Sequence, residues 1–113
     1  MTPGAIDAFC LALPGATTDL LWGADQVYKV GGKMFAVAGP TGGVSFKAND
    51  VAFEMLVESG AARPAPYMAR AKWVLVDDPS NFPEADLRQY LEQAHAQIAA
   101  RLTRKARLQL GLG

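Results

Sequence analysis

The chain has 113 residues, of which 50% are hydrophobic and 19% are charged, so it is expected to form one globular domain over residues 1–113. This composition excludes an intrinsically disordered chain. Eleven Lys and Arg balance eleven Asp and Glu, and the resulting net charge of zero excludes strong, non-specific binding of polyanions by the whole surface.

The first half of the chain predicts one helix followed by three strands. Thr2 and Pro3 are typical of a helix start, and Pro14 with Gly15 ends the predicted helix over residues 3–13. One face of this helix would carry Ile6, Phe9, Cys10 and Leu13. We interpret the Thr-rich residues that follow as a connection.

Two β-prone runs, residues 26–30 and 33–38, flank Gly31-Gly32, which indicates a two-residue hairpin because both turn positions need a positive φ. A looser turn over residues 39–43 leads to a third strand over residues 44–47.

The second half predicts helix, strand and helix. Asn49 or Asp50 begins a helix that ends at Ser59-Gly60, with Val51, Phe53, Met55 and Leu56 expected to face inward. A short strand follows at residues 73–76. A last helix starts at Pro83, with an apolar stripe of Leu87, Leu91, Ala94, Ile98 and Leu102. The order α-β-β-β-α-β-α predicts an α+β fold, a single antiparallel sheet with helices packed mainly on one face.

The hairpin register predicts which side chains share a face of the sheet. A two-residue turn places Val30 opposite Lys33 and Tyr28 opposite Phe35. The core face would then carry Val27, Met34, Ala36, Ala38, Val44 and Phe46. The other face would show Tyr28, Val30, Lys33, Phe35, Val37, Ser45 and Lys47, an aromatic and basic surface suited to single-stranded nucleic acid. Alternatively, a helix, a partner subunit or the Pro-rich loop covers these aromatics, and a one-residue change of register exchanges the two faces.

Residues with catalytic potential are few. The chain has one histidine, His95, at the edge of an apolar stripe, and one cysteine, Cys10, on the predicted buried face of the first helix. One cysteine excludes an internal disulfide, and these two residues offer no cluster of soft metal ligands. We therefore expect a non-enzymatic protein without metal or cofactor. No basic N-terminal region and no long apolar stretch are found, so we expect a cytoplasmic protein that does not bind membranes.

The order of the charges is more informative than their sum. Residues 29–47 carry +3, residues 63–72 carry +3 and residues 99–113 carry +4, with no acidic residue in these three blocks. Such blocks are typical of solvated faces, but blocks that fold together would contact phosphates.

Four short motifs occur together in this chain: residues 10–15 at the end of the first helix, the hairpin at residues 28–36, the third strand at residues 45–47, and Pro64-Ala65-Pro66-Tyr67 followed by Lys72-Trp73. They give the sequence a resemblance to the MmcQ/YjbR family of small bacterial proteins. The resemblance implies an α+β fold similar to frataxin-like or secretion-chaperone-like proteins, and DNA binding of a double-wing-like kind.

Two hypotheses of function follow. The first is a non-enzymatic DNA-binding module without sequence specificity, in which Tyr67 and Trp73 order the loop or stack on bases. The expected nucleic-acid-binding residues are Lys33, Lys47, Arg63, Arg70, Lys72, Trp73, Arg101, Arg104, Lys105 and Arg107. The alternative is a chaperone-like adaptor that binds a protein, a ligand or a second copy of itself through the aromatic sheet face or the region of Pro64, Pro66 and Trp73.

Overall fold

A computed structural model describes residues 1–21, 25–66 and 68–112. The chain forms helices α1 (Pro3–Ala12), α2 (Asp50–Glu58), α3 (Glu84–Ala99) and α4 (Arg104–Gln109), strands β1 (Ala16–Leu21), β2 (Asp25–Val30), β3 (Lys33–Ala38), β4 (Val44–Lys47), β5 (Arg63–Pro64) and β6 (Trp73–Val76), and two 3-10 helices, η1 (Ala69–Ala71) and η2 (Pro79–Asn81).

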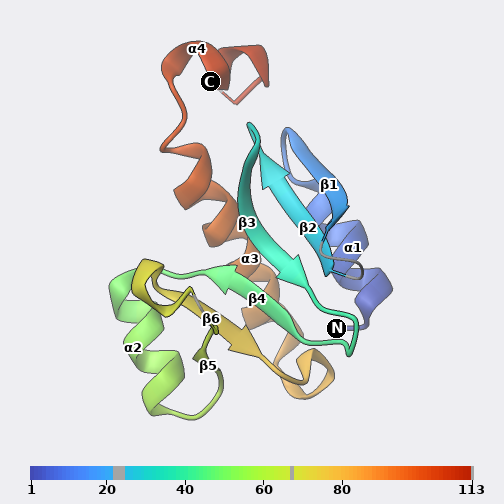
Figure 1. Ribbon diagram of the computed structural model, residues 1–113, viewed down its shortest axis with the longest axis vertical. Helices are drawn as coiled ribbons and strands as arrows, with labels where there is room; N and C mark the ends of the chain where they lie inside the picture. The colour runs from blue at the N-terminus through green and yellow to red at the C-terminus, as the bar shows by residue number, and fades with distance from the viewer. Residues whose placement is uncertain (22–24, 67, 113) are drawn as a thin grey trace.

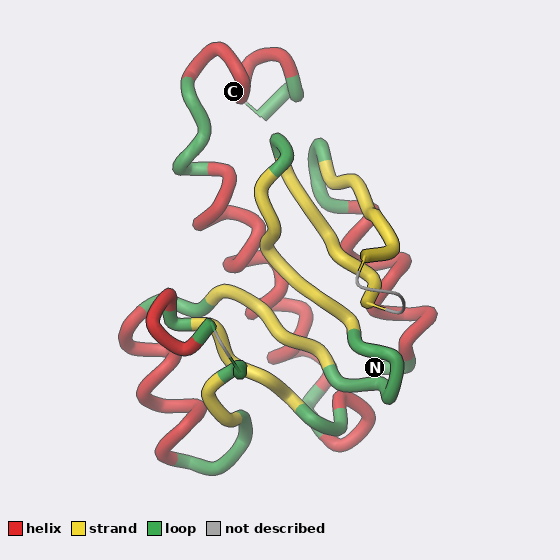
Figure 2. Tube along the Cα trace, viewed as in Figure 1, coloured by secondary structure: helices red, strands yellow, loops and turns green. Residues whose placement is uncertain are grey.

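The strands form one antiparallel sheet in the order β1-β2-β3-β4-β6-β5. Helix α3 lies across β2, β3 and β4, α1 packs on β1, and α2 packs on β5 and β6 (Figure 1). The strands lie in front of α3 in the view of Figure 2, so the face of the sheet turned toward the viewer is the one that α3 does not cover. The predicted fold, an α+β sheet with helices on one face, is confirmed.

Local signals placed several elements correctly. The Thr2 side chain accepts a hydrogen bond from Ala5 N–H at 3.1 Å, and Pro3 occupies the first turn of α1. Asn49 caps α2 by accepting from Ala52 N–H at 2.7 Å. In the β2–β3 turn, Gly31 and Gly32 have φ values of 59° and 79°, as the hairpin prediction requires.

Strand β1 was not predicted, because the Thr-rich segment was interpreted as a connection. It is an edge strand that pairs only with β2 among the described strands, and its side chains are exposed or half-buried. An edge strand with no fully buried side chain has a weak sequence signal. Thr18 attaches it by donating a hydrogen bond from Oγ1 to Val27 O at 3.0 Å.

The predicted assignment of side chains to the two sheet faces was wrong at the hairpin. Val30 pairs with Lys33 and Lys29 with Met34, as expected, but Tyr28 pairs with Ala36 because a β-bulge inserts Phe35 into β3. Tyr28, Val30 and Phe35, expected on the outer face, are at most 1% exposed and belong to the core beneath the helices. Val27 and Met34, expected in this core, belong to a second cluster on the opposite face.

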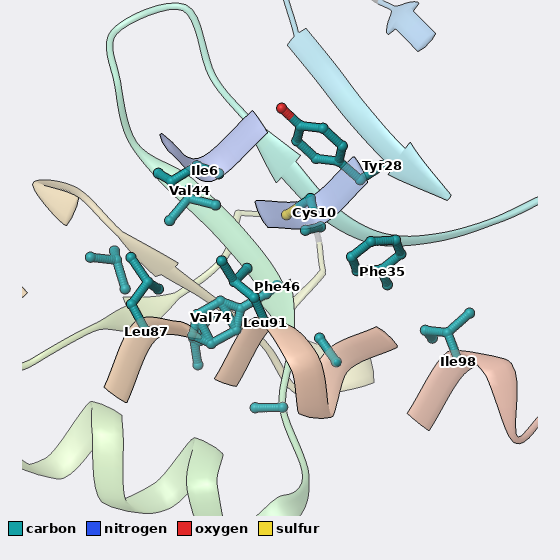
Figure 3. Packing of buried hydrophobic residues seen from close by; sticks show 14 of the residues in the cluster. Ile6, Cys10, Tyr28, Phe35, Val44, Phe46, Val74, Leu87, Leu91 and Ile98 are labelled. Carbon is teal, nitrogen blue, oxygen red and sulfur yellow. The ribbon is translucent and has the colours of Figure 1, made fainter. Parts of the chain in front are cut away.

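The main core fills the space between the sheet and the helices. Figure 3 shows Tyr28, Phe35 and Phe46 of the sheet in one buried cluster with Leu91 of α3 and Cys10 of α1. The Tyr28 hydroxyl donates a hydrogen bond to Asp7 Oδ1 of α1 at 2.8 Å, which ties that helix to the centre of the sheet.

The inward face predicted for helix α2 is only partly correct. Leu56 is buried and Phe53 packs against the core, as expected, but Val51 and Met55 are 67% and 60% exposed, and Ala52 is buried instead. The side of this nine-residue helix that faces the core is the one that carries Ala52 and Leu56.

The predicted last helix is divided in two. Helix α3 ends at Ala99, and Thr103 begins α4 by accepting a hydrogen bond from Ala106 N–H at 3.1 Å. Leu102, between them, packs so closely on the hairpin turn that a Cβ on Gly31 would lie 2.6 Å from its Cδ1. Arg101 therefore lies in the link between the two helices, and Arg104, Lys105 and Arg107 lie on a separate helix.

We predict that Phe35→Ala lowers the free energy of unfolding by about 3–5 kcal/mol, because it removes a fully buried ring from the core. Met34→Ala is the matched control, since Met34 is the half-buried neighbour on the opposite sheet face. Urea denaturation followed by circular dichroism measures both. A loss of unfolding free energy at Met34 equal to or greater than that at Phe35 would contradict the assignment of Phe35, rather than Met34, to the main core.

Candidate nucleic-acid interface

The basic side chains divide into two groups by their ion pairs. Lys29, Arg63 and Arg88 pair with Asp19, Asp77 and Glu84 at 3.2, 2.8 and 3.9 Å. The other eight have no carboxylate within 4.0 Å in the described part of the chain. These eight, all among the predicted site residues, are Lys33, Lys47, Arg70, Lys72, Arg101, Arg104, Lys105 and Arg107.

Three of these cations meet where β4 ends. Lys47 is the last residue of β4 and is only 6% exposed. Burial, together with the positive charges of Arg101 and Lys72, lowers the pKa of Lys47, although Asp50 opposes this shift. Residues from three separate charge blocks therefore act on one another electrostatically at this position.

The short loop before β6 places Lys72 in this group. Lys72 has a left-handed backbone with φ of 64°, and its N–H donates to Ala69 O at 3.0 Å. Its Nζ lies 5.0 Å from the centre of the Phe53 ring on α2, a cation–π contact. Arg70 is exposed on η1, two residues earlier.

The remaining cations follow on the link after α3, on α4 and on the β2–β3 turn (Figure 1). Arg101 lies in the link, Arg104 and Lys105 are exposed on α4, and Lys33 is exposed beside the turn that Leu102 contacts. Arg107 is half-buried, and its Nε is buried without a hydrogen-bond partner among the described residues. We use the name basic end for the full set of eight cations without a carboxylate partner: Lys33, Lys47, Arg70, Lys72, Arg101, Arg104, Lys105 and Arg107.

Two predicted site residues are buried. Lys47 donates a hydrogen bond from Nζ to Ala48 O, so it contributes charge to the basic end rather than an exposed contact. The Trp73 side chain packs in the second cluster and the residue is 5% exposed, while its backbone N–H donates to Met68 O at 3.2 Å. Its ring therefore orders the loop and is not available for base stacking. Tyr67 lies outside the described residues.

Arg63 is not brought together with the other predicted site residues. Its Nε and Nη2 donate to the two Asp77 oxygens at 2.8 and 2.9 Å. This contact lowers the pKa of Asp77. Asp77 follows the end of β6, whereas Lys47 pairs with Trp73 at its start, so Arg63 and the basic end lie at opposite ends of that strand.

The two candidate nucleophile and base residues lie in the core. Cys10 is completely buried, and burial together with the negative charge of Asp7 raises the pKa of its thiol to about 12. His95 Nε2 lies 2.7 Å from Pro14 O; because a carbonyl oxygen only accepts, this nitrogen carries the proton and donates it. The Phe35 ring and the imidazole pack in a T-shaped arrangement, with 5.3 Å between the ring centres. Both residues support the fold.

Within the described ranges, no three His, Cys, Asp or Glu side chains are grouped so that they would hold a metal ion. None of the described helices combines the length and apolar character that a membrane span requires.

Comparisons with known proteins identify relatives by sequence and by fold. No curated protein matches the sequence. The structure is similar to the crystal structure of Deinococcus radiodurans protein DR2400, with the family-model domain DUF419, at a TM-score of 0.88 and 22% identity, covering 99% of this chain and 89% of that chain. A likeness at this identity shows a shared fold. The family model described as YjbR matches residues 11–97, and the chain therefore belongs to the YjbR family.

Proposed function

We propose that this protein binds nucleic acid, DNA foremost, through the basic end and catalyses no reaction. The observation that carries the proposal is that eight cations without a carboxylate partner among the described residues lie around the end of β4, the loop before β6, the α3–α4 link, α4 and the β2–β3 turn, in a chain of zero net charge. Cations that are not neutralised by neighbouring carboxylates attract the phosphate backbone.

The arrangement favours contacts to phosphates over the reading of bases. Arg70, Arg101, Arg104 and Lys105 are exposed and come from three elements, which suits a backbone that passes across the molecular surface. Helix α4 has only six residues, and Trp73 is buried. We therefore propose binding without sequence specificity.

The unfavourable free energy of bringing the positive charges of Lys47, Lys72 and Arg101 together supports a binding role. The lowered pKa of Lys47 means that its charged form is less stable in the folded protein than in water, because of burial and of Arg101 and Lys72 nearby. A phosphate placed against Lys72 and Arg101 would relieve this repulsion. Unlike most ion pairs on a surface, such a contact would offset an unfavourable interaction that already exists.

We predict that the wild-type protein binds labelled duplex and single-stranded DNA at low salt and more weakly at physiological salt, as measured by fluorescence anisotropy. Arg104→Gln with Lys105→Gln should weaken binding and reduce the salt slope on duplex DNA by about 2, because each phosphate contact contributes about 0.9.

The control variant, Arg63→Gln with Arg88→Gln, also removes two positive charges, but from residues that are ion-paired away from the basic end. It should leave the salt slope unchanged. Absence of binding by the wild type at low salt would overturn the proposed function, and equal losses in the two variants would overturn the proposed location.

We predict that Cys10 in the folded protein is alkylated by iodoacetamide far more slowly at pH 8 than the same thiol in urea. With the pKa raised from 9.0 to about 12, the thiolate fraction falls roughly a thousandfold, and burial hinders access further. Mass spectrometry of timed samples measures the label. Rapid labelling of the folded protein would indicate a reactive thiol and argue against a purely binding role.

A further inference from the structure

The face of the sheet that α3 leaves uncovered holds a groove of about 640 Å³, which the basic end does not use. It lies between the turn that joins β3 to β4 and the segment that joins β5 to β6. Its volume falls in the range of about 300–1,000 Å³ that is typical of sites for small organic ligands.

The floor of the groove is apolar. It is formed by Met34 and Val37 of β3, Leu75 of β6 and Met68 of the β5–β6 segment. All four belong to the second hydrophobic cluster, which is anchored by buried Trp73. Two thioethers and two aliphatic side chains provide a surface on which a flat ring packs well.

The charged groups of the groove leave one net negative charge. Asp25, Asp77 and Arg63 line it, and Arg63 already donates two hydrogen bonds to Asp77 at its rim. Asp25 is half-buried, and a Cβ on Gly39 would lie 3.9 Å from its Oδ1, so this carboxylate faces the β3–β4 turn. The residues outside the described ranges contain no Lys or Arg that would neutralise it.

We propose that this groove binds a small organic cation, a ring-sized apolar body that carries a protonated amine. The body packs on Met34, Val37 and Leu75, and the ammonium group approaches Asp25. The hydroxyl groups of Thr41 and Ser45 line the same groove and offer acceptors for the remaining N–H groups. An anionic ligand is disfavoured because the only guanidinium in the described lining is already occupied by Asp77.

Tryptamine and indole-3-propionate are suitable probes, since they share an indole body and carry opposite charges. In ¹H–¹⁵N NMR titrations of the full chain, tryptamine should shift the amide signals of Val37, Ser45 and Leu75, and indole-3-propionate should bind at least tenfold more weakly. Asp25→Asn should reduce tryptamine affinity about tenfold. Asp86→Asn, which removes an exposed carboxylate in the first turn of α3, should leave it unchanged.

Ser45→Leu, which would fill the groove floor, should abolish the binding of both probes while the remaining amide spectrum shows an intact fold. Tryptamine binding should also persist when Arg104 and Lys105 are replaced by Gln, which separates this groove from the basic end. Equal or tighter binding of indole-3-propionate, an Asp25→Asn variant with wild-type affinity, or no shift at the groove with either probe would each overturn the proposal.

Discussion

The β-bulge at Phe35 is the constraint on which the rest of the structure depends. The extra residue in β3 lets Phe35 and its neighbour Ala36 both serve the core, so that Tyr28 and Phe35 lie 6.4 Å apart beneath the helices. Strict alternation would place Tyr28 and Phe35 on one face of the sheet and Ala36, with its partner Phe46, on the other. The bulge therefore decides that the bulky aromatics pack under α1 and α3, and that smaller side chains such as Val37 and Ser45 form the opposite face, where the groove lies.

The packing of α3 on this core in turn assembles the basic end. His95 of α3 contacts the Phe35 ring, and Gln97, half a turn later, donates a hydrogen bond to Lys47 O at 3.5 Å. The next residues of the chain, Arg101 and Leu102, then reach Lys47 and the β2–β3 turn. The charge constellation is thus a consequence of apolar packing between distant segments. Electrostatic repulsion among Lys47, Lys72 and Arg101 opposes this arrangement, and the core interactions offset it.

Part of the fold could be predicted from the sequence because it depends on local chemistry. Thr2 and Asn49 begin helices because their side chains satisfy free N–H groups, and Gly31-Gly32 turns because glycine tolerates positive φ. These signals act within a few residues and are legible in any sequence. The family resemblance, carried by short motifs, likewise predicted the fold and membership of the YjbR family.

What the sequence did not reveal depends on contacts between distant residues. A β-bulge cannot be recognised in the sequence when both neighbours of the extra residue are apolar as well, as Met34 and Ala36 are here. The face of Phe35 was therefore assigned wrongly. The end of α3 at Ala99 was missed because Leu102 continues the apolar spacing, yet its partner is Gly31 of the hairpin. The three basic blocks were visible along the chain, but the separation of Arg63 from the others depends on its pairing with Asp77. The groove combines residues of β2, β3, β4, β5 and β6 and of the loops between them, and no spacing rule connects them.

The basic end and the groove carry opposite charge on one small domain, which raises the question of how strongly they influence each other. Lys47, at the end of β4, lies two residues after Ser45. In the other direction from Ser45, Val44 pairs with Ala38 of β3, and the residue after Ala38 is Gly39, which faces Asp25. At about 3.3 Å per residue, an ammonium group beside Asp25 would be at least about 10 Å from the end of β4. Two unit charges at that distance in water interact by about 0.4 kcal/mol, and salt at physiological strength screens charges beyond about 8 Å. This energy corresponds to no more than a twofold change in affinity. The two sites are therefore nearly independent electrostatically, and any stronger coupling between them would have to pass through the β5–β6 segment, which contributes Met68 to the groove and Arg70 and Lys72 to the basic end.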